Sequence, residues 1–119
     1  MRHDPKKLLY DMKQAADRIV RFTAGRTHEE FLADDFFRSA VERQFEIIGE
    51  AMTRLRRFSP KTADRITNAN KIAGFRNNLI HGYDTVNSTI TWNVVVNHLG
   101  ILRTELDALL AEPDEPAVG

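Results

Sequence analysis

Apolar residues recur every three or four positions through three long stretches of the chain, and this spacing constrains the fold more than any other feature. The first stretch predicts a helix over residues 5–23, with Asp4 as its N-cap. The second predicts a helix over residues 35–57, and the third predicts a last helix that starts near Thr89 to Thr91 and is stopped by Pro113. An amphipathic helix must bury its apolar stripe against another element, so these helices are expected to pack together.

Shorter helical segments are predicted between the long ones. Thr27 stands three positions before Glu30, as in a capping box that opens a short helix. Ser59-Pro60 opens another that runs through Ile66, and a further helix carries the apolar residues of 72–80 and ends near Gly82. Residues 84–88 are predicted to form a loop. The whole pattern predicts an all-α fold, an up-and-down four-helix bundle with short accessory helices.

Composition narrows the protein class. The chain has 119 residues, 17 basic against 17 acidic residues, and no cysteine, which excludes disulfides, thiol nucleophiles and thiolate metal sites. We expect one helical domain over residues 1–112 and an acidic, disordered tail over residues 113–119. Neither a signal peptide nor a long apolar span is evident, so a cytoplasmic protein without membrane contact is expected.

Residues 74–83, Gly-Phe-Arg-Asn-Asn-Leu-Ile-His-Gly-Tyr, differ most from an ordinary helix. Helical spacing sets Arg76 into the apolar stripe, and a half-buried arginine normally has an anionic partner. His81 falls on another face, with small or amide side chains that suit the close approach of a ligand or a second helix. The segment can also be read structurally, with Arg76 paired to Glu46 or Glu50 of the long helix and His81 beside a glycine C-cap.

The segment resembles the signature of the HEPN superfamily, in the form found in HepT-like ribonuclease toxins. Arg76, Asn77, His81 and Tyr83 all match that signature. Residues 46–51, Glu-Ile-Ile-Gly-Glu-Ala, resemble the centre of the long helix in the same family. The similarity extends over roughly residues 5–111, and two motifs in the right order make it fairly specific.

The resemblance implies a metal-independent endoribonuclease that acts on RNA as a homodimer, without a cofactor. Arg76 and His81 would be the catalytic residues, with Asn77 orienting the site and Glu46 or Glu50 holding Arg76 in place. These residue types suit the chemistry, because an imidazole with an ordinary pKa of about 6.5 can take or give a proton near neutrality. A guanidinium neutralises the charge that develops on a phosphate.

Tyr83 has two interpretations. Its ring can simply pack against the last helix, with its hydroxyl at the rim. In HepT-like proteins, the matching tyrosine is the residue to which a cognate minimal nucleotidyltransferase antitoxin attaches AMP, which silences the toxin. The resemblance therefore implies such an antitoxin as a partner of this chain. The alternatives are a non-catalytic HEPN subunit that binds a nucleotide or a nucleotidyltransferase partner, and a purely structural dimeric bundle.

The neutral total charge conceals a strong segregation along the chain. Residues 54–76 hold seven basic residues and one acidic residue, whereas residues 26–50 hold three basic and seven acidic residues. Residues 105–119 hold five acidic residues and no basic one. The basic block leads directly into the motif, so salt-sensitive binding of RNA near Arg76 remains compatible with a net charge of zero. A solvated helix face is the simpler interpretation of the same block.

Overall fold

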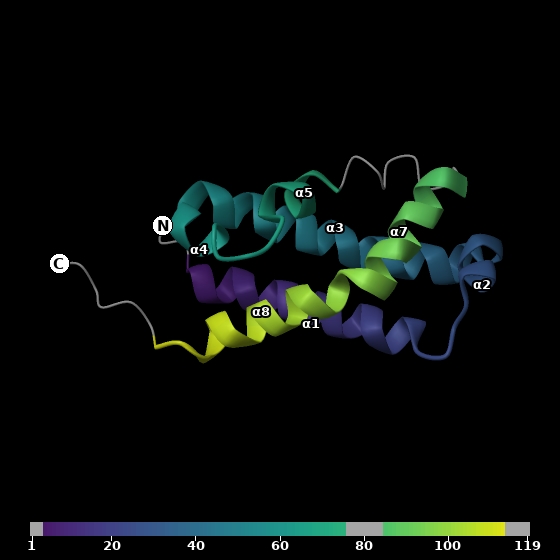
Figure 1. Cartoon of the computed structure of the whole chain (residues 1–119), viewed down its shortest axis with the longest axis horizontal. Coiled ribbons are helices and arrows are strands. Elements are labelled where there is room, and N and C mark those ends of the chain that lie inside the picture. Colours follow the sequence, from purple (N-terminus) through teal and green to yellow (C-terminus); the bar gives the residue numbers. More distant parts are fainter. Residues whose placement is uncertain (1–3, 76–84, 114–119) are drawn as a thin grey trace.

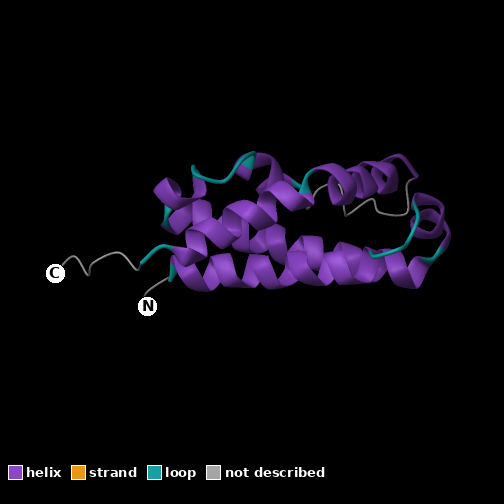
Figure 2. Cartoon of the chain, turned by 60° about the horizontal axis from the view of Figure 1, so that its bottom comes forward, coloured by secondary structure: helices purple, strands orange, loops and turns teal. Residues whose placement is uncertain are grey.

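The computed structural model describes residues 4–75 and 85–113, and its regular secondary structure there is helical throughout (Figures 1 and 2). The helices are α1 (Pro5–Thr23), α2 (His28–Ala33), α3 (Asp35–Phe58), α4 (Pro60–Ala63), α5 (Ala69–Gly74), α7 (Thr85–Asn97) and α8 (Leu99–Ala111). The prediction of an all-α bundle is confirmed.

The ends of the first two helices follow the capping residues of the sequence. The Asp4 carboxylate accepts a hydrogen bond from the Lys6 N–H at 2.9 Å, which satisfies one free donor at the start of α1. Gly25 has φ 71°, a left-handed conformation that turns the chain after α1 at little steric cost. Thr27 accepts from the Glu30 N–H at 3.1 Å, while the Glu30 carboxylate accepts from the Thr27 N–H at 3.1 Å. The predicted capping box is therefore present.

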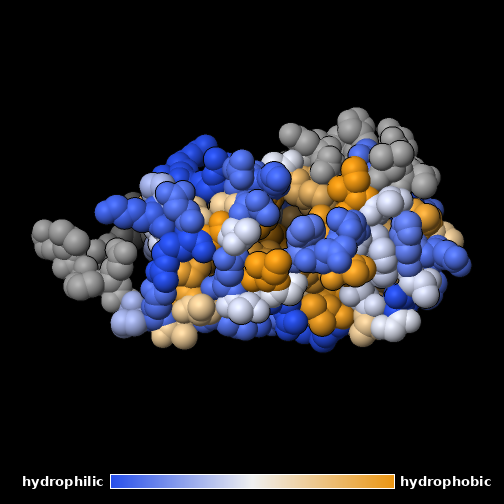
Figure 3. All heavy atoms as spheres, viewed as in Figure 1, coloured by the Kyte–Doolittle hydropathy of each residue, from blue (hydrophilic) through white to orange (hydrophobic). Residues whose placement is uncertain are grey.

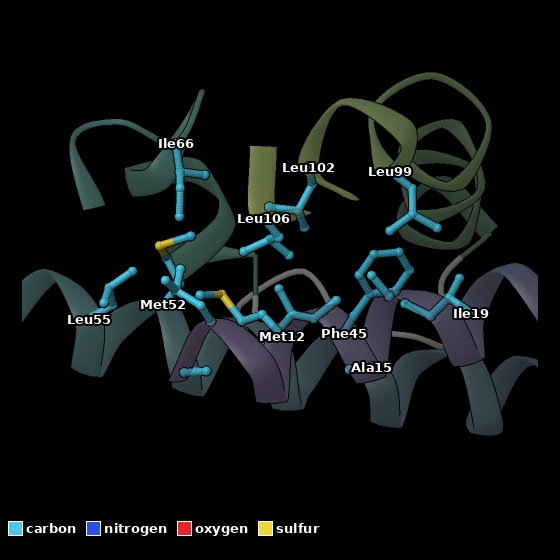
Figure 4. Packing of buried hydrophobic residues seen from close by; sticks show 14 of the residues in the cluster. Met12, Ala15, Ile19, Phe45, Met52, Leu55, Ile66, Leu99, Leu102 and Leu106 are labelled. Atoms are coloured by element: carbon cyan, nitrogen blue, oxygen red, sulfur yellow. The ribbon is translucent and has the colours of Figure 1, made fainter. Parts of the chain in front are cut away.

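The two longest helices, α1 and α3, run side by side along the long axis of the molecule, with α2 at one end and α4 at the other (Figure 1). Helix α8 packs on α1, and α4 and α5 pack on α3. Apolar side chains from α1, α3 and α8 meet between these helices, together with Ile66, as Figure 4 shows. Met12, Ile19, Met52, Leu55 and Leu106 are completely buried. Each such side chain contributes about 1.5–3 kcal/mol of hydrophobic stabilisation relative to an exposed one.

The predicted last helix is wrong in two respects. It begins at Thr85, so residues 85–88 of the predicted loop are helical, and it is divided at His98 into α7 and α8. His98 has φ −122° and ψ −25°, outside the usual helical values, while its N–H still donates to the Val94 carbonyl at 3.0 Å. The division redirects the chain so that Leu99 enters the core, where it is 3% exposed.

The short helix that was expected to run through Ile66 ends at Ala63. The backbone tightens there, because the Arg65 and Ile66 N–H groups donate to carbonyls three residues earlier, at 3.1 and 3.0 Å. A further helix was predicted to end near Gly82. In the described part of that region, the structure contains α5. Residues 76–84 lie outside the described residues, as do residues 114–119 of the predicted tail. None of the described helices is long and apolar enough to span a membrane.

Candidate functional site

The residue that immediately precedes the motif is held against the middle of α3. Phe75 follows α5 with helical φ and ψ, and its N–H donates to the Ile72 carbonyl at 3.3 Å. Its ring packs edge-on against Phe45, with 5.3 Å between ring centroids and 65° between ring planes. Phe45 is 5% exposed, so this pair joins the start of the motif to the core.

The four motif residues themselves, Arg76, Asn77, His81 and Tyr83, lie outside the described residues. Their assignment as catalytic, orienting and modified residues therefore stays a prediction. What the structure provides is the surface from which the motif starts, formed by α3, α5, α7 and α8.

A partly open cavity of about 530 Å³ lies among these four helices. Its apolar lining includes Phe45, Ile48, Ile72, Phe75, Leu99 and Leu102. Polar groups also line it, from Asn68, Lys71, Asn93 and His98. Gly74 faces open space, since no atom lies within 4 Å of the position that a Cβ would take. The cavity is the size of a small-molecule site and combines a large apolar surface with a few polar groups, which suits a flat ring that carries hydrogen-bonding edges.

The two carboxylates expected to support Arg76 occupy the solvent side of α3. Glu46 is half-buried and pairs with Arg43, with 3.3 Å between its Oε2 and Arg43 Nη1. Glu50 is exposed. Their proposed contact with Arg76 cannot be read from the described residues, so it too stays a prediction.

A third carboxylate of α3, Glu42, was missed by the sequence analysis. Its side chain is only 17% exposed, and its Oε1 lies 3.6 Å from Arg38 Nε. Burial raises the pKa of the Glu42 carboxyl above its ordinary value, Arg38 opposes the rise, and Glu46 adds to it. The described residues that line the cavity do not include Glu42, so the shift in its pKa does not by itself assign it a part in the site. The sequence feature that could have pointed to Glu42 is its position three residues before Phe45, which places both residues on the same side of the helix.

Arg38 is fixed by contacts other than Glu42. Its Nη1 donates to the carbonyls of Phe31 and Leu32 at 3.1 and 2.8 Å, and its Nη2 donates to Asp35. It thereby satisfies carbonyl groups near the end of α2, which a short helix cannot satisfy internally. Arg38 is a structural cation, and Glu42 shares it with the backbone.

Histidines outside the motif form no metal centre in the described part of the chain. His28 stacks on Trp92 with 13° between ring planes, and its Nε2 lies 3.2 Å from Thr89 Oγ1. His98 is exposed at the cavity. Within residues 4–75 and 85–113, no three histidine or carboxylate side chains gather closely enough to hold a metal ion.

Comparison with known proteins identifies the family. The family model described as "Ribonuclease HepT-like" matches residues 12–109, most of the chain and all of the motif. This chain belongs to the HepT-like ribonuclease family. Its relatives in that family include "Putative RNase MJ1380" of Methanocaldococcus jannaschii, which is 30% identical over 89% of this chain and 96% of the relative. "Probable ribonuclease HepT" of Thermococcus cleftensis is 31% identical over 92% of this chain and 98% of the relative. No solved structure matches the chain significantly.

Proposed function

We propose that this HepT-like protein is a metal-independent endoribonuclease toxin of a type VII-like toxin–antitoxin system. The observation that carries the proposal is the complete set of Arg76, Asn77, His81 and Tyr83 inside the region that the family model matches. The relatives' names, which call them ribonucleases, support the same activity.

The proposed residues can perform the reaction. Attack by the RNA 2′-hydroxyl on the adjacent phosphorus needs a base for the hydroxyl proton and an acid for the leaving 5′-oxygen. An imidazole has an ordinary pKa of about 6.5, so the His81 side chain could perform either task near neutrality. Arg76 would neutralise the charge that develops on the phosphate oxygens, and Asn77 would hydrogen-bond to the phosphate. No metal ion is needed to generate the nucleophile, because the substrate supplies it.

Two histidines are needed if base and acid are different groups, and each chain offers one in this motif. A two-fold homodimer brings two copies of the same motif together, so each site would combine Arg76 and His81 from both protomers. This argument supports the dimer as part of the proposal.

Cleavage of RNA by purified protein in the presence of a chelator tests the activity. The wild-type chain and His28→Gln, the control at a histidine outside the motif, are expected to cleave. His81→Ala and Arg76→Ala are expected to be inactive. Cleavage by His81→Ala at the wild-type rate would refute the catalytic role of the histidine.

Mixing the wild type with His81→Ala tests the composite site. If both histidines of the dimer are needed, mixed dimers are expected to be inactive, so cleavage falls below the share contributed by wild-type chains. Two independent sites within separate protomers would keep cleavage proportional to the fraction of wild-type chains. Light scattering of the purified chain would report the dimer directly.

The proposed regulation is attachment of AMP to Tyr83 by a nucleotidyltransferase antitoxin that uses ATP and magnesium. Added phosphates beside Arg76 would occupy the anion site and repel RNA. The chain has two tyrosines, and Tyr10 is 49% exposed on α1, which makes Tyr10→Phe a matched control. Intact mass after co-expression is expected to show AMP on the wild type and Tyr10→Phe, but not on Tyr83→Phe. The same adduct on Tyr83→Phe would refute the assignment.

A further inference from the structure

One end of the bundle carries a group of exposed basic side chains. This basic end consists of Arg54, Arg56 and Arg57 at the end of α3, Lys61 on α4 and Lys71 on α5. None of them forms an ion pair with a carboxylate of the described residues. Arg65 lies on the same part of the chain but is paired with Glu112, so it is not counted. Figure 3 shows hydrophilic residues gathered over the end where α4 lies.

Basic residues near the other end of the bundle are used differently. Arg26 pairs with Glu30 at 2.7 Å and with Asp34 at 3.2 Å. Arg38 pairs with Asp35 and Glu42, and Arg43 pairs with Glu46. These three arginines are therefore neutralised by carboxylates of the described residues. Clustered like charges repel one another, so five exposed basic residues that have no such ion pair are a cost to the folded state that a bound polyanion would remove.

The basic end leads along α3 toward the candidate site. Arg56 follows Phe45 by eleven residues, which places the two on nearly the same line of the helix and about 16 Å apart along its axis. Phe45 contacts Phe75, the neighbour of Arg76 in the chain. Lys71 lies on α5, which packs on α3, and it lines the cavity together with Phe45 and Phe75. Positive charge therefore extends from the end of the bundle to the start of the motif.

We propose that the basic end binds backbone phosphates of the RNA substrate several nucleotides away from the cleaved bond. At about 3.4 Å per stacked nucleotide, 16 Å corresponds to about five nucleotides. A nucleic-acid backbone fits this surface better than a protein does, because the centre of a protein interface is apolar and depleted in charged residues. Arg57 already lies over the ring of Phe58, the exposed aromatic beside it, at 5.9 Å. The proposal rests on the ribonuclease function proposed above and assigns part of the substrate's binding site.

The test compares RNA substrates of two lengths, each with one cleavable bond. The short one extends two nucleotides to either side of that bond, and the long one extends eight. The variant is Arg56→Gln/Arg57→Gln/Lys61→Gln, which changes exposed positions only. Arg21→Gln is the control, an exposed arginine in the last turn of α1 at the opposite end of the bundle. The measured quantity is the ratio of kcat/KM for the long substrate to kcat/KM for the short one.

The wild type and Arg21→Gln are expected to prefer the long substrate, and the triple variant is expected to lose most of that preference. Each lost phosphate contact lowers the slope of log affinity against log salt by about 0.7 for a single strand, so three contacts lower it by about 2. Between about 50 and 200 mM salt, that difference corresponds to roughly 18-fold. An unchanged length ratio and an unchanged salt slope would overturn the proposal.

Failure of the proposed function gives a different result. If the wild type cleaves neither substrate, binding of the labelled long RNA to the wild type and the triple variant still tests the basic end by fluorescence anisotropy. A weaker affinity and a smaller salt slope in the triple variant would support RNA binding without cleavage. Equal affinities would overturn this inference as well, and would direct attention to an acidic protein partner.

Discussion

The contact between Phe45 and Phe75 is expected to couple the stability of the bundle to the activity of the motif. The ring centroids lie 5.3 Å apart at 65°, inside the range for edge-to-face aromatic pairs. Such pairs contribute about 0.5–1.5 kcal/mol beyond the area that they bury. Replacement of either ring by leucine keeps an apolar side chain of similar size but removes the aromatic geometry.

A double-mutant cycle measures this coupling. Phe45→Leu, Phe75→Leu and the double variant are unfolded with urea at one protein concentration, and unfolding is followed by the fluorescence of Trp92, the only tryptophan. The coupling free energy is expected to be about 0.5–1.5 kcal/mol. Phe36 is 87% exposed, so Phe36→Leu serves as the control, and its effect is expected to add to that of Phe75→Leu.

The same variants test the functional consequence. Phe75→Leu is expected to lower RNA cleavage under conditions where the protein remains fully folded, because the ring contact with Phe45 holds Phe75, the residue beside Arg76, against α3. Phe36→Leu is expected to cleave at the wild-type rate. A coupling below about 0.3 kcal/mol, which lies within the additivity of independent sites, would refute the structural reasoning. Wild-type cleavage by a folded Phe75→Leu variant would refute the link to function.

Four further substitutions have defined outcomes. Thr27→Ala removes the capping hydrogen bond to Glu30 and is expected to lower the free energy of unfolding by about 1 kcal/mol, measured by urea denaturation. Because burial raises the pKa of Glu42, its contribution to stability is fully present below its ordinary pKa of 4.5 and is lost as pH rises through the higher folded value. The free energy of unfolding of Glu42→Gln should therefore fall less over that interval. Gly74→Ala is expected to raise the free energy of unfolding by about 0.5–1 kcal/mol, and Gly74→Trp to reduce cleavage by filling the cavity.

The first half of the fold could be predicted closely because local signals and tertiary packing agree there. Asp4 and Thr27 both accept the backbone hydrogen bonds that their positions predict, and the helix predicted over residues 35–57 ends one residue later in the structure. The apolar stripes of α1 and α3 face each other, so the residues that recur at helical spacing are also the residues that the fold buries.

The region of α7 and α8 could not be predicted in the same way. Apolar residues continue through Val95, Val96 and Leu99 without proline, and the break at His98 leaves no signal in the spacing. Polar residues before this point suggested a loop, yet Ser88 and Thr91 are buried, at 3% and 2% exposure. Thr91 Oγ1 donates to the Asn87 carbonyl at 3.0 Å, so the helix itself satisfies this hydroxyl and packing overrides its turn preference.

The candidate site shows why spacing within one helix does not assign a partner between helices. Glu46 and Glu50 were expected to hold Arg76 on helix geometry alone, and this contact with Arg76 stays a prediction. Contact with Phe75 shows that α3 turns the side of Phe45 toward α5, and at 100° per residue Glu46 and Glu50 are rotated by 100° and 140° from it. Glu42 is rotated by only 60° from Phe45, in the same sense as Glu46, and its side chain is only 17% exposed. Which face of α3 points toward α5 is set by the residues that pack between the two helices. The packing of Phe75 on Phe45 is a tertiary contact, and residue spacing along α3 alone does not predict it.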